Sequence, residues 1–201
     1  MFYLGLDLGQ KEDHSAIAIV EKREQPRGDS YSQRREQTRT TQLLVRRAER
    51  VALGTPYPQV VEIVREIAGG PALAGRCALV VDGTGVGAPV VDMLRAAGLG
   101  CEITAVTITG GERESRRGVP KRDLMAVVQL ALERGELRIA RRMKNAGALV
   151  RELLDMRMTA TGGMGAEGYG EHDDLVIALA LACWRARRRE NGYRGERLPG
   201  I

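Results

Sequence analysis

An aspartate inside a short apolar run at the start of the chain most restricts what this sequence can fold into. Residues 3–9 read Tyr-Leu-Gly-Leu-Asp-Leu-Gly. In a β-strand the three leucines would share one face, and Asp7 would lie on the other face between Gly5 and Gly9, where another group can approach. A buried carboxylate needs an ion pair, hydrogen bonds or a metal ion. The run therefore predicts a half-buried strand that displays a functional carboxylate, or else a turn former or ion-pair partner at a strand end.

Composition favours one α/β domain. The 201 residues predict a single domain over 1–190 and a frayed tail over 191–201. Aromatic residues make up only 3% of the chain, so the core must be built from Ala, Val, Leu and Ile, which suits a sheet covered by helices. The net charge of +5 comes mostly from arginine and makes nucleic acid a candidate partner.

Hydrophobic patterning predicts the order of elements along the chain. The expected main strands are 3–9, 14–20, 42–51, 77–82 and 102–108, with a short edge strand at 137–139. The expected helices are 58–68, 88–97, 120–134, 142–158 and 175–189. Polar, charged or glycine-rich loops are expected over 21–41, 109–118 and 159–170.

Connection lengths predict how these strands are arranged. The first three are joined closely enough to be antiparallel, whereas the later strands alternate with helices and should be parallel with right-handed crossovers. The predicted fold is therefore α/β, with a five-stranded mixed sheet of order 3-2-1-4-5, its second strand antiparallel, flanked by helices. This order would place Asp7 and Asp82 at the same end of adjacent strands.

A third acidic position, Asp173 and Asp174, begins the last helix. Clustered carboxylates repel one another, and hard oxygen ligands favour Mg²⁺ or Mn²⁺, so we expect a site for two such ions. Each residue also has a simpler interpretation, because Asp82 could be a turn residue and the Asp173 pair could cap the helix. His172 is either a proton shuttle, an outer metal ligand or a structural loop histidine.

Basic residues in two charged regions are candidates for DNA contact without sequence reading. They are Arg34, Arg35, Arg39, Arg113, Arg116, Arg117, Lys121 and Arg122. For each of them the alternative is a solvated charge in a loop.

Three motifs together resemble the C-terminal nuclease domain of phage large terminases. They are Leu-Gly-Leu-Asp at 4–7, Val-Val-Asp-Gly-Thr-Gly-Val-Gly at 80–87, and Glu-His-Asp-Asp-Leu-Val-Ile-Ala-Leu-Ala at 171–180. The resemblance covers nearly the whole chain. It implies an RNase H-like fold related to the RuvC resolvases and metal-dependent endonuclease activity on double-stranded DNA. It also implies Asp7, Asp82 and Asp174 as metal ligands with Asp173 nearby.

The sequence departs from that family in one respect, which concerns the ATPase that drives DNA packaging. A complete large terminase also carries a packaging ATPase, yet no Gly-x-x-x-x-Gly-Lys-Ser/Thr loop occurs here. The chain would then be an excised domain, a split subunit or a free-standing relative, and its implied partner is a packaging ATPase or another phage packaging protein. The alternatives are a RuvC-like branched-DNA resolvase, an actin-like or sugar-kinase ATP-binding fold, and an inactive DNA-binding module.

The sequence also bears on the compartment. It has no run long enough to cross a membrane and no signal-peptide pattern at its start, and its three scattered cysteines do not have zinc-site spacing. We therefore expect a cytoplasmic protein without a membrane partner, and the resemblance implies a bacterial host cell and a phage or prophage origin.

Overall fold

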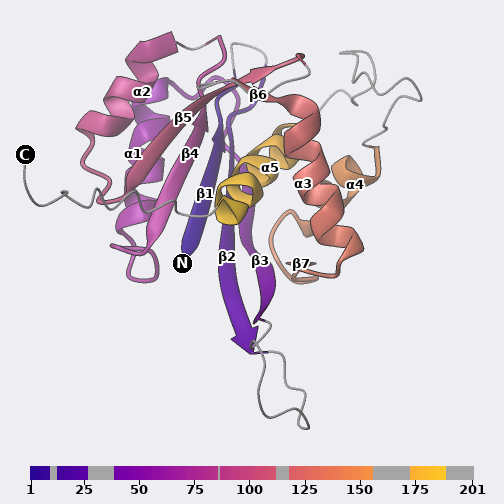
Figure 1. Ribbon diagram of the computed structural model, residues 1–201. Coiled ribbons are helices and arrows are strands. Elements are labelled where there is room, and N and C mark those ends of the chain that lie inside the picture. The colour runs from indigo at the N-terminus through magenta and orange to yellow at the C-terminus, as the bar shows by residue number, and fades with distance from the viewer. Residues whose placement is uncertain (10–12, 27–38, 86, 112–117, 156–172, 189–201) are drawn as a thin grey trace, which may run out of the picture.

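The computed structural model describes residues 1–9, 13–26, 39–85, 87–111, 118–155 and 173–188, and in that part of the chain a single mixed sheet is covered by helices on both faces (Figure 1). Its strands are β1 (Phe2–Asp7), β2 (Ala16–Pro26), β3 (Arg39–Arg50), β4 (Cys77–Asp82), β5 (Glu102–Thr109), β6 (Gly118–Pro120) and β7 (Leu137–Ile139). Its helices are α1 (Tyr57–Gly69), α2 (Gly87–Ala96), α3 (Lys121–Glu133), α4 (Ala146–Asp155) and α5 (Asp174–Arg187).

The sheet order confirms the predicted arrangement of the central strands. The order is β6-β5-β4-β1-β2-β3-β7, so the five main strands follow 3-2-1-4-5. Strand β2 is antiparallel to both β1 and β3, whereas β1, β4 and β5 are mutually parallel. The short strand β7 is the predicted edge strand, and it pairs parallel with β3.

The predicted count of five strands is wrong, because two three-residue strands extend the sheet to seven among the described residues. Strand β6 lies in a segment expected to be loop and the first turn of a helix. Its Pro120 is compatible with an edge strand, where a missing N–H breaks no ladder. So short a strand leaves no periodic pattern in the sequence.

The hairpin between β2 and β3 is longer than predicted. The charged stretch 21–41 is expected to be loop, yet residues 21–26 and 39–41 are paired strand. Ion pairs on the exposed ribbon explain the difference, since Arg46 and Arg23 both contact the carboxylate of Glu21. The predicted loop residues 27–38 lie outside the described part of the chain.

Helix boundaries differ from the predictions mainly at α4. The predicted helix covers 142–158, but α4 begins at Ala146, because residues 141–145 form turns that end at Asn145 with a φ of 63°. Residues 156–158 and the predicted loop 159–170 are not described, and the same holds for the tail 191–201. None of the helices in the described ranges is long and apolar enough to cross a membrane.

The core has two layers, one on each face of the sheet. As predicted, the leucines of the first strand share a face, and Leu4, Leu6 and Leu8 pack in the layer that contains α1 and α2. The opposite layer contains Tyr3 of β1, the whole of α5, and the buried sides of α3 and α4. Figure 1 shows α1 and α2 on one side of the sheet and α3, α4 and α5 on the other.

Helix α5 is the central element of the second layer. Every residue from Asp174 to Ala186 is buried, which confirms the prediction that this apolar helix is almost fully enclosed. It lies directly against β1 at Gly5, where a Cβ would overlap the carbonyl oxygen of Ala178 and lie 2.9 Å from the backbone nitrogen of Ala182. Glycine is therefore required at position 5 by the close approach of two backbones.

We expect Gly5→Ala to lower the free energy of unfolding by about 3 kcal/mol or more, because α5 must move away from the sheet to admit the methyl group. Urea denaturation followed by circular dichroism measures this. Gly69→Ala at the end of α1 is the matched control, because a Cβ there meets nothing within 4 Å and should change stability by less than about 1 kcal/mol. Equal stabilities for the two variants would contradict the close contact.

Candidate functional site: a carboxylate cluster at the start of the last helix

Asp7 and Asp82 lie side by side at the ends of two parallel strands. Leu6 is in register with Val81, so the next residues along β1 and β4 are the two aspartates. Side chains alternate along a strand, so Asp7 lies on the same face of β1 as Tyr3, and Asp82 on the same face of β4 as Val80. Tyr3 and Val80 belong to the core layer that contains α5. The two carboxylates are therefore on the face that α5 covers, and they lie at the same end of adjacent strands, as the sequence predicted.

Asp82 also shapes the turn that follows β4. Its Oδ1 accepts hydrogen bonds from the backbone N–H of Thr84 at 2.8 Å and from the Thr84 hydroxyl. The Thr84 hydroxyl oxygen in turn accepts the N–H of Ile108 at 2.8 Å, which joins this turn to β5. The interpretation of Asp82 as a turn residue is thus correct for one carboxylate oxygen, and the same turn fixes where the side chain is presented.

Asp173 and Asp174 each have a basic partner from a different element. The Asp174 side chain is buried and its Oδ2 accepts from Nε of Arg50 at 3.1 Å. The Oδ2 of Asp173 accepts from Nζ of Lys121 at 2.7 Å. Asp173 occupies the N-cap position of α5, but its side chain makes no capping hydrogen bond, so the alternative of a simple helix cap is wrong for this side chain.

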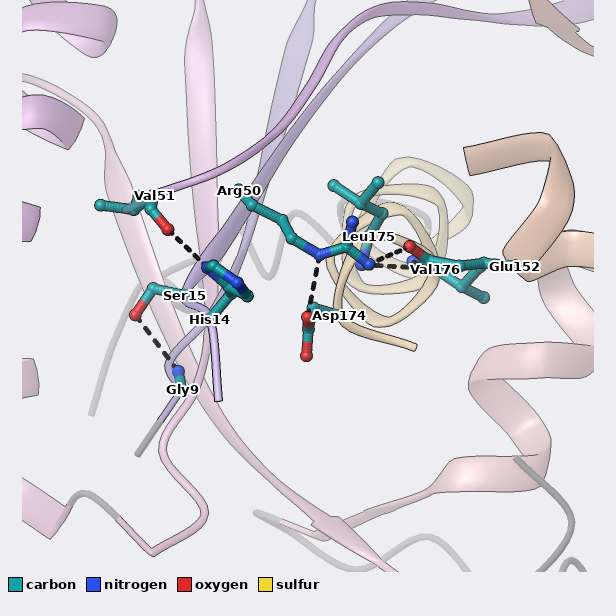
Figure 2. Close-up of polar contacts among 9 residues, drawn as sticks. All are labelled: Gly9, His14, Ser15, Arg50, Val51, Glu152, Asp174, Leu175 and Val176. Atoms are coloured by element: carbon teal, nitrogen blue, oxygen red, sulfur yellow. Dashed lines mark hydrogen bonds and ion pairs between the residues drawn. The ribbon is translucent and has the colours of Figure 1, made fainter. Parts of the chain in front are cut away.

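The capping group of α5 comes instead from α4. Oε2 of Glu152 accepts from the N–H groups of Leu175 at 3.1 Å and Val176 at 3.2 Å, and Oε1 accepts from Arg50. Figure 2 shows Arg50 between the carboxylates of Glu152 and Asp174, at the first turn of the helix. The Glu152 side chain therefore accepts from two N–H groups in the first turn of α5, which have no acceptor within the helix. It also anchors the arginine that holds Asp174.

Sequence reasoning missed both Arg50 and Glu152, although each leaves a signal. Glu152 follows the buried residues Ala146 and Leu149 at helical spacing, so it places a carboxylate on the apolar side of α4. Arg50 lies two residues after the buried Ala48 and so shares its face of β3. A charged side chain on a core-facing position needs a partner, which is what each of these two residues supplies to the other.

A second set of hydrogen bonds holds Gly9, two residues after the end of β1. The hydroxyl oxygen of Ser15 accepts the N–H of Gly9 at 3.2 Å, and the Tyr57 hydroxyl donates to the Gly9 carbonyl at 3.1 Å. Nδ1 of His14 lies 2.9 Å from the Val51 carbonyl oxygen (Figure 2). These contacts fix the chain immediately beyond Asp7.

The electrostatics of the cluster converge on Asp7. Burial is the largest cause that raises the pKa of the Asp7 carboxyl well above its usual value. The carboxylates of Asp82, Asp174 and Asp173 raise this pKa further, in that order. Lys121 has the opposite effect. Asp7 is therefore the point at which the negative charges of three elements act together.

The carboxylate side chains suit a hard divalent cation, but within the described residues they are not arranged as a complete set of metal ligands. Carboxylate oxygens are the ligands that Mg²⁺ and Mn²⁺ prefer, and a cation would relieve the repulsion that Asp7 experiences. Within the described ranges, however, no three His, Cys, Asp or Glu side chains are grouped closely enough to hold a metal ion. Arg50, Lys121 and Thr84 hold Asp174, Asp173 and Asp82 instead.

Most of the other predicted site residues lie outside the described part of the chain. These are His172, Arg34, Arg35, Arg113, Arg116 and Arg117. Arg39 begins β3, and nothing is described of its side chain. Arg122 lies 3.4 Å from the carboxylate of Asp123. Lys121 is a predicted DNA contact, and the structure places it inside the carboxylate cluster.

Comparison with known proteins shows the fold. The sequence matches no protein-family model and no curated protein. The structure is similar to the nuclease domain of g2p, the large terminase of bacteriophage SPP1, solved with bound Mn. The TM-score is 0.54 at 13% identity, with 92% of this chain and 85% of that chain covered. RuvC of Thermus thermophilus gives a TM-score of 0.39 at 18% identity, with 91% of each chain covered.

The chain thus has an RNase H-like fold, as the sequence predicted. This assignment rests on the sheet order and on the likeness to the SPP1 terminase nuclease domain. That likeness is one of fold, since few residues are identical.

Removing the Glu152 carboxylate should destabilise the protein, because it leaves two N–H groups of α5 and one side of Arg50 without their acceptor. We expect Glu152→Ala to lower the free energy of unfolding by about 2 kcal/mol in urea denaturation. The matched control is Glu66→Ala, an exposed carboxylate on α1, which should change stability by less than about 0.5 kcal/mol. A loss no larger than that of the control would mean that Glu152 does not cap the helix.

Neutralising Asp7 should have the opposite effect on stability. In EDTA at pH 7, we expect Asp7→Asn to stabilise the fold by about 1 kcal/mol, because it removes a half-buried charge that three like charges repel. Thermal denaturation measures this, and added Mn²⁺ should raise the Tm of the wild type but not that of the variant.

Asp92→Asn is the control for this measurement, since Asp92 is exposed on α2 and paired with Arg95. It should leave the Tm in EDTA and the response to Mn²⁺ close to those of the wild type. Destabilisation by Asp7→Asn in EDTA would show that the Asp7 charge is compensated rather than repelled.

Proposed function

We propose that this protein is a metal-dependent endonuclease that hydrolyses phosphodiester bonds of double-stranded DNA. The observation that carries the proposal is the placement of Asp7 and Asp82 at adjacent strand ends, with Asp173 and Asp174 near enough to raise the pKa of the half-buried Asp7. This cluster lies on an RNase H-like sheet similar to that of the SPP1 terminase nuclease domain, which binds Mn. By this proposal the chain would act in phage DNA packaging, with a packaging ATPase or another packaging protein as partner.

Asp7, Asp82 and Asp174 are the residues that would hold Mg²⁺ or Mn²⁺, with Asp173 beside them. Two cations bound by carboxylates supply an activated water and stabilise the leaving oxygen of a phosphodiester. The contribution of the chain is the fixed position of the donors. Asp7 and Asp82 are set by adjacent strand ends, and Asp174 by the first turn of a helix packed on the same strands.

Arg50 and Lys121 would orient the carboxylates on the helix side. Within the described part of the chain, Arg50 binds only Oδ2 of Asp174, so Oδ1 remains for another ligand. Lys121 contacts Asp173 and is close enough to Asp7 to lower its pKa. Its ammonium group is therefore placed where it would also face a phosphate brought to the cluster.

Nicking of supercoiled plasmid in Mg²⁺, Mn²⁺ or EDTA tests the activity. We expect cutting by the wild type with either metal and none in EDTA. Asp7→Asn and Asp174→Asn should each reduce the rate by at least about a hundredfold, because each removes a charged metal ligand.

Asp92→Asn is again the matched control and should cut like the wild type, since it exchanges the same groups far from the cluster. Full activity of Asp7→Asn would reject the assigned site. A plasmid that stays intact with folded wild-type protein and Mn²⁺ would reject the nuclease proposal for this chain.

A further inference from the structure

Strand β3 contains an extra residue that turns two arginines toward solvent. Ile19 of β2 pairs with Arg47, whereas the next residue, Val20, pairs with Val45. Arg46 is thus the additional residue of a β-bulge, and bulges redirect side chains at sheet edges. The side chains of Arg46 and Arg47 are 44% and 46% exposed, side by side on the strand.

The chain that leaves β7 forms the opposite wall of a groove beside this bulge. Strand β7 pairs with β3 only up to Val45. Beyond that point the side-chain amide of Asn145 donates to the Ala48 carbonyl at 3.0 Å, which ties the turns of residues 141–145 to the edge of β3. The positive φ of Asn145 lets the chain turn directly into α4.

The resulting groove has a volume of about 480 Å³ and is strongly basic. Its charged and large lining residues are Arg46, Arg47, Glu49, Arg142, Met143 and Lys144. Four of these carry positive charge and one carries negative charge. Glu49 pairs with Arg47 at 2.6 Å, and Arg46 pairs with Glu21 on the neighbouring strand.

The other two cations are available to a ligand. Arg142 and Lys144 are exposed, and neither forms an ion pair or side-chain hydrogen bond within the residues that the structure describes. They come from one short loop whose backbone is held by Asn145. Two unpaired cations held on a fixed loop, facing two arginines, favour the binding of an extended polyanion.

Strand β3 contributes side chains both to the groove and to the carboxylate cluster, but from opposite faces. Arg47 lies three residues before Arg50 in β3, about 10 Å along the strand, and its side chain is on the face of Ile19 in the α1 and α2 layer, whereas Arg50 is on the α5 face. Arg50 contacts Asp174.

We propose that this groove binds the phosphate backbone of duplex DNA. The inference rests on the proposed nuclease function and adds a contact surface to it. Arg142 and Lys144 neutralise phosphates, and Arg46 and Arg47 form the opposite wall. The contacts read no sequence, because cations in this position face the backbone rather than base edges.

The test is binding of a fluorescein-labelled 30-base-pair duplex, measured by anisotropy in EDTA over a range of salt concentrations, so that no cutting occurs. The test variant is the double substitution Arg142→Glu with Lys144→Glu in the full chain. We expect its affinity to fall tenfold to about a hundredfold at 0.1 M salt. The slope of log K against log salt should become shallower by about two, one for each phosphate that the variant no longer neutralises.

The matched control is Arg76→Glu with Arg95→Glu, which makes the same change in net charge. Both residues are exposed, with Arg76 just before β4 and Arg95 in the last turn of α2, at the end of the sheet opposite the carboxylates. An equal loss of affinity in the test and control variants would overturn the groove proposal, because it would show that only the net charge of the protein matters. Absence of duplex binding by the wild type would overturn it as well.

Binding and cutting separate the two proposals. If the groove variant loses binding selectively while wild-type protein with Mn²⁺ leaves plasmid intact, the groove stands and the nuclease proposal fails. If the groove variant binds and nicks like the wild type, the groove proposal fails and the nuclease proposal stands.

Discussion

The contact between Gly5 and Ala178 sets the geometry of the whole site. Because Gly5 has no side chain, the backbone of α5 rests directly on β1. Asp7 lies two residues beyond Gly5, about 7 Å along the strand, and Asp174 lies one helical turn before Ala178, about 6 Å along the helix. These two steps start at one contact and have nearly equal length. The sheet and the helix bring Asp174 near enough to Asp7 to raise the pKa of the Asp7 carboxyl.

Such a cluster is costly, and the fold offsets the cost with a separate partner for three of the four acids. Asp82 is held by Thr84, Asp174 by Arg50 and Asp173 by Lys121. Asp7, the most central, has no such neutralising contact within the described residues and has a raised pKa. Uneven compensation of this kind is typical of functional sites, where stability is lost in favour of a defined charge distribution.

Local patterns in the sequence were enough to predict the central sheet. Alternation in residues 3–9 gave the faces of β1, and the apolar run before Asp82 gave its neighbour. Strand β6 was not predictable, because three residues are too few to show a period. The long β2–β3 ribbon was missed because its stability depends on pairs such as Arg46 and Glu21, which are 25 residues apart. Glu152 and Arg50 belong to the same class, since their roles arise from tertiary contacts.

The bulge in β3 also decides which residue reaches the carboxylates. Before the bulge the core-facing residues of β3 are odd-numbered, Leu43 and Val45, and after it they are even-numbered, Ala48 and Arg50. The bulge at Arg46 thus shifts the inward and outward alternation of the β3 side chains by one residue. If the same sequence ran through this region as a regular strand with no bulge, Glu49 would face Asp174 and add a fifth carboxylate to the four aspartates, in place of the guanidinium of Arg50. The presence of the bulge, and not only the composition of this segment, therefore determines the charge balance of the site.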